Sequence, residues 1–179
     1  MEALLLLAMI YAAIGLLLSL CVHVLSIIGY QPAGPGLFFA LHVGIFPLWI
    51  FVVLISLKMT GGSRPRKDFW KFVLRGCPVW LKYLTYGFFI YAVVNFLYFF
   101  VTTATSGKAH AGGVSPSDWH GFSGHWMAFY CAGLAISTSA YRIGWKYLAE
   151  KCPNGHDVSP DHDYCPTCGS KVARESSPL

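Results

Sequence analysis

The stretch ALLLLAMIYAAIGLLLSLCVHVLSIIG, residues 3–29, decides the fold class of this chain. It contains no charged residue, and it is longer than the roughly 20 apolar residues that a helix needs to cross a bilayer. A secretory signal peptide would have a basic start, a shorter apolar centre and a small-residue cleavage site. The chain instead begins with Met1 and Glu2, and no convincing cleavage site follows. We therefore predict that residues 3–29 form a retained transmembrane helix.

Three further segments have the same apolar character. Charged residues make up 12% of the chain, against roughly 25% in a typical soluble domain. The turn YQPAGPG, residues 30–36, should fold the second segment back on the first, and Pro47 should kink that second helix. We predict an all-α integral membrane protein with a four-helix domain over residues 1–148 and a small tail over residues 149–179. The expected transmembrane helices are residues 3–29, 37–57, 83–105 and 126–148.

Lysine and arginine gather on one side of this topology. Of the thirteen, seven lie in residues 58–82 and five from residue 142 onward, while Lys108 is the only one elsewhere. Basic residues are enriched in cytoplasmic loops. We therefore expect a bacterial inner-membrane protein with both termini in the cytoplasm and with residues 106–125 as an outer loop. The cytoplasm also keeps thiols reduced, which suits the cysteines of the tail.

The basic connection between the second and third helices allows two interpretations. Its centre, DFWKFVLRG, places apolar residues on one side and basic residues on the other. This pattern is typical of a short amphipathic helix in the headgroup plane, where basic side chains contact anionic lipid. The alternative is an ordinary basic loop. The candidate lipid contacts are Arg64, Arg66, Lys67, Lys71 and Arg75.

The tail CPNGHDVSPDHDYCPTCG, residues 152–169, has the spacing of a metal site. Cys152 and His156 form a C-x3-H pair, and Cys165 and Cys168 form a C-x2-C pair. Two such pairs supply the four ligands of a closed, tetrahedral, structural Zn2+ site. A tail of roughly twenty polar residues buries too little to fold alone, so the ion would have to stabilise the fold. His162 is the alternative to His156 as the fourth ligand. His156 is favoured because the glycine before it permits a tight turn.

The motif CPNGH…YCPTCG resembles the zinc-ribbon tails common in bacterial proteins, in which a C-x-x-G-H knuckle pairs with an aromatic-C-x-x-C-G knuckle. The resemblance covers residues 152–171 and implies a structural metal without assigning a role. More loosely, the membrane part resembles uncharacterised bacterial four-helix membrane proteins through the stretch GFSGHWMAFY, residues 121–130. That second resemblance implies a fold and a location but no activity.

The charge of the tail bears on its partner. A nucleic-acid surface would be basic and studded with aromatic residues. The charges here are mixed, with Asp157, Asp161 and Asp163 against Lys171 and Arg174. We therefore expect a protein partner or a purely structural role, and no nucleic acid.

Four histidines form a second candidate site on the outer side. His23 and His42 should lie at a similar depth in the first two helices, His125 should cap the fourth helix, and His120 should lie in the adjoining loop. Ionisable residues inside a membrane often mark functional sites. They could hold a transition metal, hold a b-type haem between two helices, or simply form interhelical hydrogen bonds to serine, tyrosine or backbone groups.

No arrangement of nucleophile and base predicts an enzyme, and no helix contains a central carboxylate of the kind that ion-coupled transporters use. We therefore predict a membrane-anchored zinc-ribbon protein that acts as a non-catalytic interaction or structural subunit, in contact with the lipid bilayer and with a protein partner. Homo-oligomerisation is a further expectation. The alternative is a membrane redox or metal-binding protein that uses the outer histidines.

Overall fold

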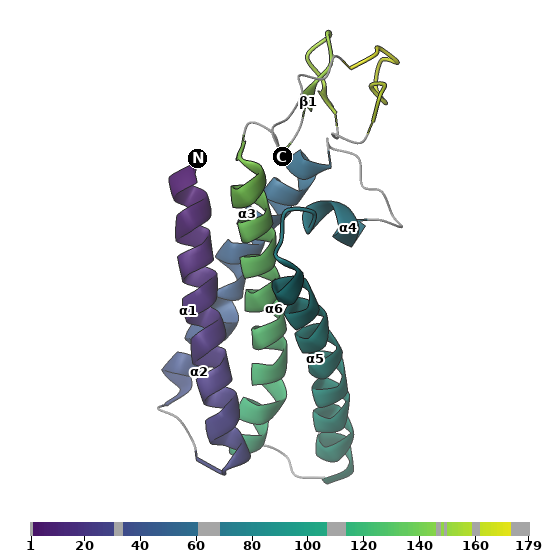
Figure 1. Cartoon of the computed structure of the whole chain (residues 1–179). Coiled ribbons are helices and arrows are strands. Elements are labelled where there is room, and N and C mark those ends of the chain that lie inside the picture. The colour runs from purple at the N-terminus through teal and green to yellow at the C-terminus, as the bar shows by residue number, and fades with distance from the viewer. Residues whose placement is uncertain are drawn as a thin grey trace.

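The computed structural model describes residues 2–30, 34–60, 69–106, 114–145, 148, 150–158 and 162–172. The described part is mainly helical, with a two-stranded sheet in the tail (Figure 1). Its elements are α1 (Glu2–Ile27), α2 (Pro35–Val43), α3 (Ile45–Met59), α4 (Phe69–Val73), α5 (Val79–Ser106), α6 (Pro116–Ile143), β1 (Glu150–Lys151) and β2 (Asp157–Val158).

Three helical stretches are long and apolar enough to cross a membrane. They are Glu2–Ile27, Pro35–Met59 and Val79–Ala104. At 1.5 Å per residue, a 26-residue helix is about 39 Å long, which exceeds the roughly 30 Å hydrocarbon core of a bilayer. The prediction of a mainly helical chain with apolar helices of membrane-spanning length is therefore confirmed for three of the four expected spans, and these three lie within a few residues of their predicted bounds.

The second stretch is broken at Gly44, three residues before Pro47, so that it forms two helices, α2 and α3. A proline has no N–H for the carbonyl four residues earlier, and its ring clashes with that carbonyl, which interrupts the helix there. Two tyrosine hydroxyls donate to carbonyls at the break: Tyr11 to Gly44 at 2.9 Å, and Tyr130 to Leu41 at 2.9 Å. Such side chains satisfy backbone groups that a bilayer could not.

The fourth helix differs most from the prediction. We expected residues 126–148, whereas α6 begins ten residues earlier, at Pro116, and ends at Ile143. Ser115 accepts a hydrogen bond from the Asp118 N–H, and the Asp118 carboxylate accepts one from the Ser115 N–H, which is a capping box. Gly144, with a φ of 85°, ends the helix. The expected loop over residues 106–125 is thus partly helix.

Helix α6 is the centre of the bundle, and α1, α3 and α5 all pack against it (Figure 1). Seventeen of its 28 residues are buried, and many of these are Gly, Ala, Ser or Thr. A Cβ on Gly124 would lie 2.6 Å from the Asn95 amide, so glycine is required for this approach of α5 to α6. Small residues commonly line close helix contacts in membranes. Because α6 faces protein rather than lipid, its sequence is less apolar than those of its neighbours.

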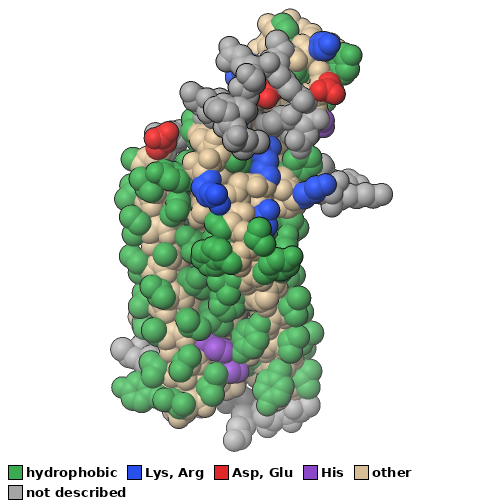
Figure 2. Space-filling view, in the orientation of Figure 1, with side chains coloured by type: hydrophobic (Ala, Val, Ile, Leu, Met, Phe, Trp, Pro, Cys, Tyr) green, Lys and Arg blue, Asp and Glu red, His purple; other side chains and the backbone are tan. Residues whose placement is uncertain are grey.

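The two ends of the bundle differ in chemistry. The start of α1 and the tail lie at the same end, while the end of α1, the end of α5 and the start of α6 lie at the other (Figure 1). Figure 2 shows the Lys and Arg side chains of the visible face at the end that carries the tail, and bundle histidines near the opposite end. On this face, basic side chains and bundle histidines therefore lie at opposite ends of the bundle, as the distribution of charges along the sequence predicts.

The basic connection contributes only five residues of described helix, α4, near the tail end of the bundle. Val73 is fully buried, whereas Lys71 is exposed and Trp70 is 40% exposed. The predicted lipid contacts Arg64, Arg66 and Lys67 lie outside the described residues. The described part of the segment therefore has one buried side and one exposed basic side chain.

Candidate metal centre

Two short turns build the ligand cluster of the tail. In the first, β1 pairs antiparallel with β2, and the loop between them carries Cys152 and His156. The Cys152 carbonyl accepts a hydrogen bond from the Gly155 N–H at 2.8 Å, and the Cys152 N–H donates to the His156 carbonyl at 3.1 Å. Gly155 has a φ of 82°, a conformation that favours glycine. The turn holds the Cys152 and His156 side chains on one side.

The second turn repeats this arrangement with Cys165 and Cys168. The Cys165 carbonyl accepts from the Gly169 N–H at 2.8 Å, and the Cys165 N–H donates to the Ser170 carbonyl at 2.8 Å. Gly169 has a φ of 71°. An isolated bridge between Tyr164 and Lys171 closes the base of the turn. Gly155, which the sequence indicated as the turn residue before His156, and Gly169, which follows Cys168, both have a positive φ.

The four predicted ligands come together, and their ligand atoms all lie within 4.8 Å of one another. Cys152 Sγ lies 3.5 Å from His156 Nδ1 and 3.7 Å from Cys168 Sγ, and Cys165 Sγ lies 3.8 Å from His156 Nδ1. This Cys3His group could hold a metal ion. Among the described residues it is the only group of three or more His, Cys, Asp or Glu side chains with that property, and His162 does not belong to it.

Two of the four ligands, Cys152 and Cys165, belong to the tail's own buried core, whereas His156 is half-buried and Cys168 is exposed. The buried cluster of the tail consists of Cys152, Val158, Cys165 and Val172. Two valines bury far less apolar surface than an independent domain needs. The tail therefore requires a further source of stability, which a bound ion would provide.

Hydrogen bonds at the exposed edge of the cluster favour a thiolate. Hydrogen bonds with the side chain and backbone of Ser170 lower the pKa of Cys168 to about 5, while burial raises the pKa of Cys152. A metal ligand must be the deprotonated thiolate, so Cys168 is prepared to bind, and Cys152 would release its proton when an ion binds.

The tail is joined to the bundle by a short connection with two side-chain contacts. The Arg75 guanidinium donates a hydrogen bond to the Leu148 carbonyl at 3.3 Å, and Leu148 itself is fully buried. The Lys58 ammonium lies 4.3 Å from the centre of the Trp145 ring, a cation–π contact. Arg75, which we had predicted to contact lipid, is thus engaged with the connection to the tail.

The outer histidines form two pairs rather than one cluster. His23 stacks on His120 with ring centroids 4.7 Å apart, and the rings of His42 and His125 are 5.8 Å apart. His120 and His125 both lie within α6, so the predictions that His120 lies in a loop and that His125 caps the helix are wrong. The cause is the capping box at Ser115, which starts the helix before both residues.

His23 is fully engaged by protein groups. Its Nδ1 lies 2.7 Å from Ser123 Oγ, and its Nε2 lies 2.6 Å from the Tyr91 hydroxyl. Because both ring nitrogens have protein partners, neither is free to ligate a metal or haem iron. This geometry corresponds to the third sequence interpretation, an interhelical hydrogen-bond network.

The network continues around the first pair. Ser26 Oγ lies 3.4 Å from His120 Nδ1, and the Asn95 amide donates to the His120 and Gly121 carbonyls at 2.9 and 3.2 Å. In the second pair, His42 Nδ1 accepts a hydrogen bond from the Trp126 indole at 3.1 Å. Sequence reasoning missed Tyr91, Ser123 and Trp126. His120 and Ser123 are three residues apart, so they lie on one face of α6. Had the start of the helix been recognised, this spacing would have indicated that both can contact the same residue, here His23.

No protein-family model, curated protein or solved structure matches this chain. The resemblance of the tail to zinc ribbons therefore rests on the residues and spacing of its two knuckles. The geometry of the ligand cluster supports metal binding independently of that resemblance.

Proposed function

We propose that this chain is a membrane-anchored zinc-ribbon protein, in which a four-helix bundle presents a rigid, non-catalytic interaction module at the cytoplasmic surface of a bacterial inner membrane. The observation that carries the proposal is the convergence of Cys152, His156, Cys165 and Cys168 close to the end of the bundle. Each further element of the proposal has its own support.

Zinc is the ion that this ligand set suits best. Ligand atoms 2.0–2.3 Å from a central Zn2+ stand about 3.5–3.8 Å apart in a tetrahedron. Three of the separations between ligand atoms of the tail are 3.5, 3.7 and 3.8 Å, and all of them are within 4.8 Å. Four protein ligands leave no open position for a substrate or reactive water, which favours a structural role.

The proposed topology has four crossings. Besides the three apolar stretches, α6 has 28 residues and would be about 42 Å long, enough to span a bilayer inside the other helices. An even number of crossings puts both ends of the chain on one side, in agreement with the position of the start of α1 and of the described tail in Figure 1. The concentration of basic residues at that end favours the cytoplasm, where thiols stay reduced.

A protein partner is favoured over nucleic acid. In the described tail, the acidic Glu150 and Asp163 offset the basic Lys151 and Lys171. Tyr164, next to a ligand cysteine, is 60% exposed on the rigid second knuckle. Exposed aromatic side chains on rigid elements are frequent anchors in protein interfaces. We propose that Tyr164 is the centre of the docking surface.

Metal analysis of the purified protein tests the proposal. The wild-type chain should carry about one zinc per chain, and Cys165→Ser/Cys168→Ser should carry none. Cys21→Ser is the matched control, because Cys21 is exposed on α1 and outside the cluster. If the double variant kept its zinc, the assignment of the tail would be wrong.

The partner is tested separately. Tyr164→Ala should keep its zinc but lose crosslinks between the tail and other membrane proteins in native vesicles. Tyr83→Ala, which alters a tyrosine that is 72% exposed on α5, is the control. Unchanged crosslinks in Tyr164→Ala would contradict the docking role while leaving the metal site intact.

A further inference from the structure

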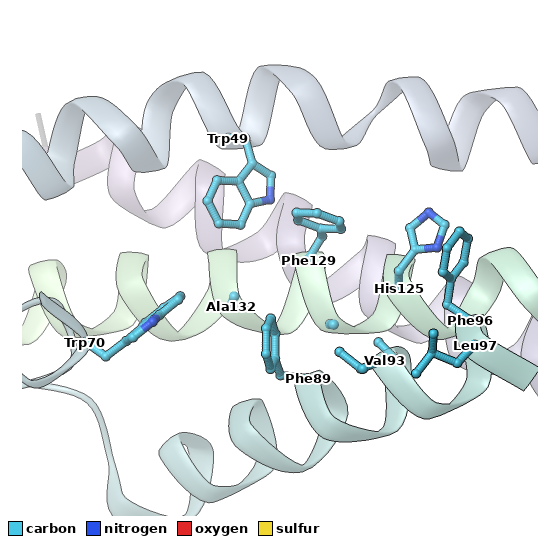
Figure 3. Close-up of a pocket in the computed structure, with 11 residues that line it drawn as sticks. Trp49, Trp70, Phe89, Val93, Phe96, Leu97, His125, Phe129 and Ala132 are labelled. Atoms are coloured by element: carbon cyan, nitrogen blue, oxygen red, sulfur yellow. The ribbon is translucent and has the colours of Figure 1, made fainter. Parts of the chain in front are cut away.

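A lateral groove opens in the middle of the bundle between α3 and α5. Both helices pack on α6, which forms the floor of the groove, and the cavity has a volume of about 440 Å3 (Figure 3). Phe89 and Phe96 of α5 line one side, Trp49 of α3 lines the other, and Phe129 projects from the floor. Trp70 of α4 closes the end nearer the tail.

The groove opens to lipid rather than to water. Phe89 and Leu97, which line it, are 60% and 57% exposed, and they lie in the central part of a stretch apolar enough to cross a membrane. His125, at the other end from Trp70, is nine residues into α6, about 14 Å from the start of the helix. A ligand would therefore enter sideways from the bilayer.

Two polar groups in this apolar groove have no protein partner among the described residues. Trp49 Nε1 is buried without a hydrogen bond. The contacts of His125 are between rings, with neighbours that include Phe96 at 6.2 Å and Phe129 at 6.1 Å between centroids. Its situation differs from that of His23, whose two ring nitrogens both have partners. Buried donors normally find a partner, so the unpaired Trp49 N–H, together with the imidazole of the half-buried His125, makes the groove complementary to a ligand with an acceptor atom.

The chemistry of the walls narrows the ligand class. Aromatic side chains favour a ligand with a flat ring. A neutral imidazole and an indole can both donate a hydrogen bond to a carbonyl oxygen. The volume of the groove lies within the range of roughly 300–1,000 Å3 that is typical of ligand sites with few polar groups. A phospholipid acyl chain would fill the apolar walls but leave both donors unpaired. A phospholipid ester carbonyl belongs near the headgroups, far from the depth of Trp49.

We propose that the groove between α3 and α5 binds a lipid-soluble quinone, with the ring held among Phe96, Phe129 and Trp49 and a ring carbonyl accepting a hydrogen bond from His125. The proposal concerns binding alone. It does not depend on the zinc ribbon, because the groove and the tail share no residue.

Retention of decylubiquinone tests the proposal. The full chain is placed in phosphatidylcholine nanodiscs, incubated with increasing decylubiquinone and passed over a gel-filtration column, and quinone per chain is measured in an organic extract. Empty nanodiscs correct for partitioning into lipid. Wild type should retain quinone saturably at about one per chain, and decylbenzene, which has the chain and ring but no carbonyl, should not compete.

Three variants locate the site. His125→Phe should weaken retention about threefold to tenfold, the effect of one lost hydrogen bond in an apolar site, and His125→Gln, which keeps a donor, should restore much of it. Trp49→Phe keeps the ring and should cause a smaller loss, which provides a second test should His125→Phe fold poorly. Tyr98→Phe, exposed on α5 and outside the groove, should bind as wild type.

Several results would overturn the proposal. Retention equal to that of empty nanodiscs, or equal in wild type and His125→Phe, would remove the site. Effective competition by decylbenzene would show an acyl-chain groove. A stably bound phospholipid in native mass spectra that quinone does not displace, or a stable homodimer lost on mutating Phe89, would assign the groove to lipid or to a second copy instead.

Discussion

The tail and the bundle each bring a histidine into close contact with other polar side chains, but the tail does so over a short stretch of chain and the bundle over a long one. In the tail, His156 joins three cysteines within 17 residues of chain, and two glycine turns set the geometry. In the bundle, His23 meets Ser123 and Tyr91 across 100 and 68 residues, and helix packing sets the geometry. The tail side chains remain available as ligands, whereas the His23 nitrogens are paired with protein groups. Residue type alone therefore does not distinguish a ligand from a structural histidine.

The largest effect should come from removing two of the four ligands of the tail's metal site. Cys165→Ser/Cys168→Ser should unfold the tail, because a structural zinc site contributes about 10–16 kcal/mol in small zinc modules and the remaining core is two valines. Limited proteolysis should then cleave within residues 150–172, while the helical circular dichroism of the bundle stays unchanged. A tail that resists protease as the Cys21→Ser control does would contradict the account.

A close contact in the bundle should have the next largest effect. A Cβ on Gly15 would clash with the ring of Tyr130, which is buried and bonded to the Leu41 carbonyl. Gly15→Ala should lower the free energy of unfolding by about 1–3 kcal/mol without loss of zinc. Gly87→Ala is the control, because nothing lies within 4 Å of a Cβ there. Unfolding in a denaturing detergent measures both, and equal stability of the two variants would argue against this helix packing.

Replacing one histidine of each region by phenylalanine sharpens the comparison. His156→Phe should lose the metal. His23→Phe should keep it and lower bundle stability by about 1–2 kcal/mol, because Ser123 and Tyr91 lose their partner. Zinc analysis and detergent unfolding on the same samples give both readouts. Loss of a metal or of a haem Soret band in His23→Phe would contradict the structural role of this residue.

The smallest effect concerns the junction between the two regions. Arg75→Gln should weaken the contact with the Leu148 carbonyl by about 1 kcal/mol and speed amide exchange around residues 148–152, with the metal retained. Lys71→Gln, at an exposed position on α4, should leave exchange unchanged. Identical exchange in the two variants would remove Arg75 from the junction.

The sequence predicted those features that depend on local pattern. Long uncharged runs predicted α1 and α5, and ligand spacing predicted the four members of the metal cluster. The predicted bounds of α6 were wrong because they rested on apolar content, and an internal helix lined by Gly, Ala and Ser has too little of it. The capping box Ser115–Asp118 was a readable signal for its start.

The remaining features depend on helix rotation, which no local pattern determines. The sequence predicted a depth for His23 and His42 but not their partners, because depth does not say which way a side chain points. His42 contacts His125 and Trp126, which lie on α6. The groove between α3 and α5 was likewise unpredictable, since its walls come from four helices.

A full metal inventory of the purified protein tests the central claim most directly, that the tail holds the metal and the bundle histidines do not. We expect about one zinc per chain in wild type and in His23→Ala/His42→Ala, and none in Cys165→Ser/Cys168→Ser. Zinc that persists without the two cysteines, or a second metal that disappears with the two histidines, would contradict the account.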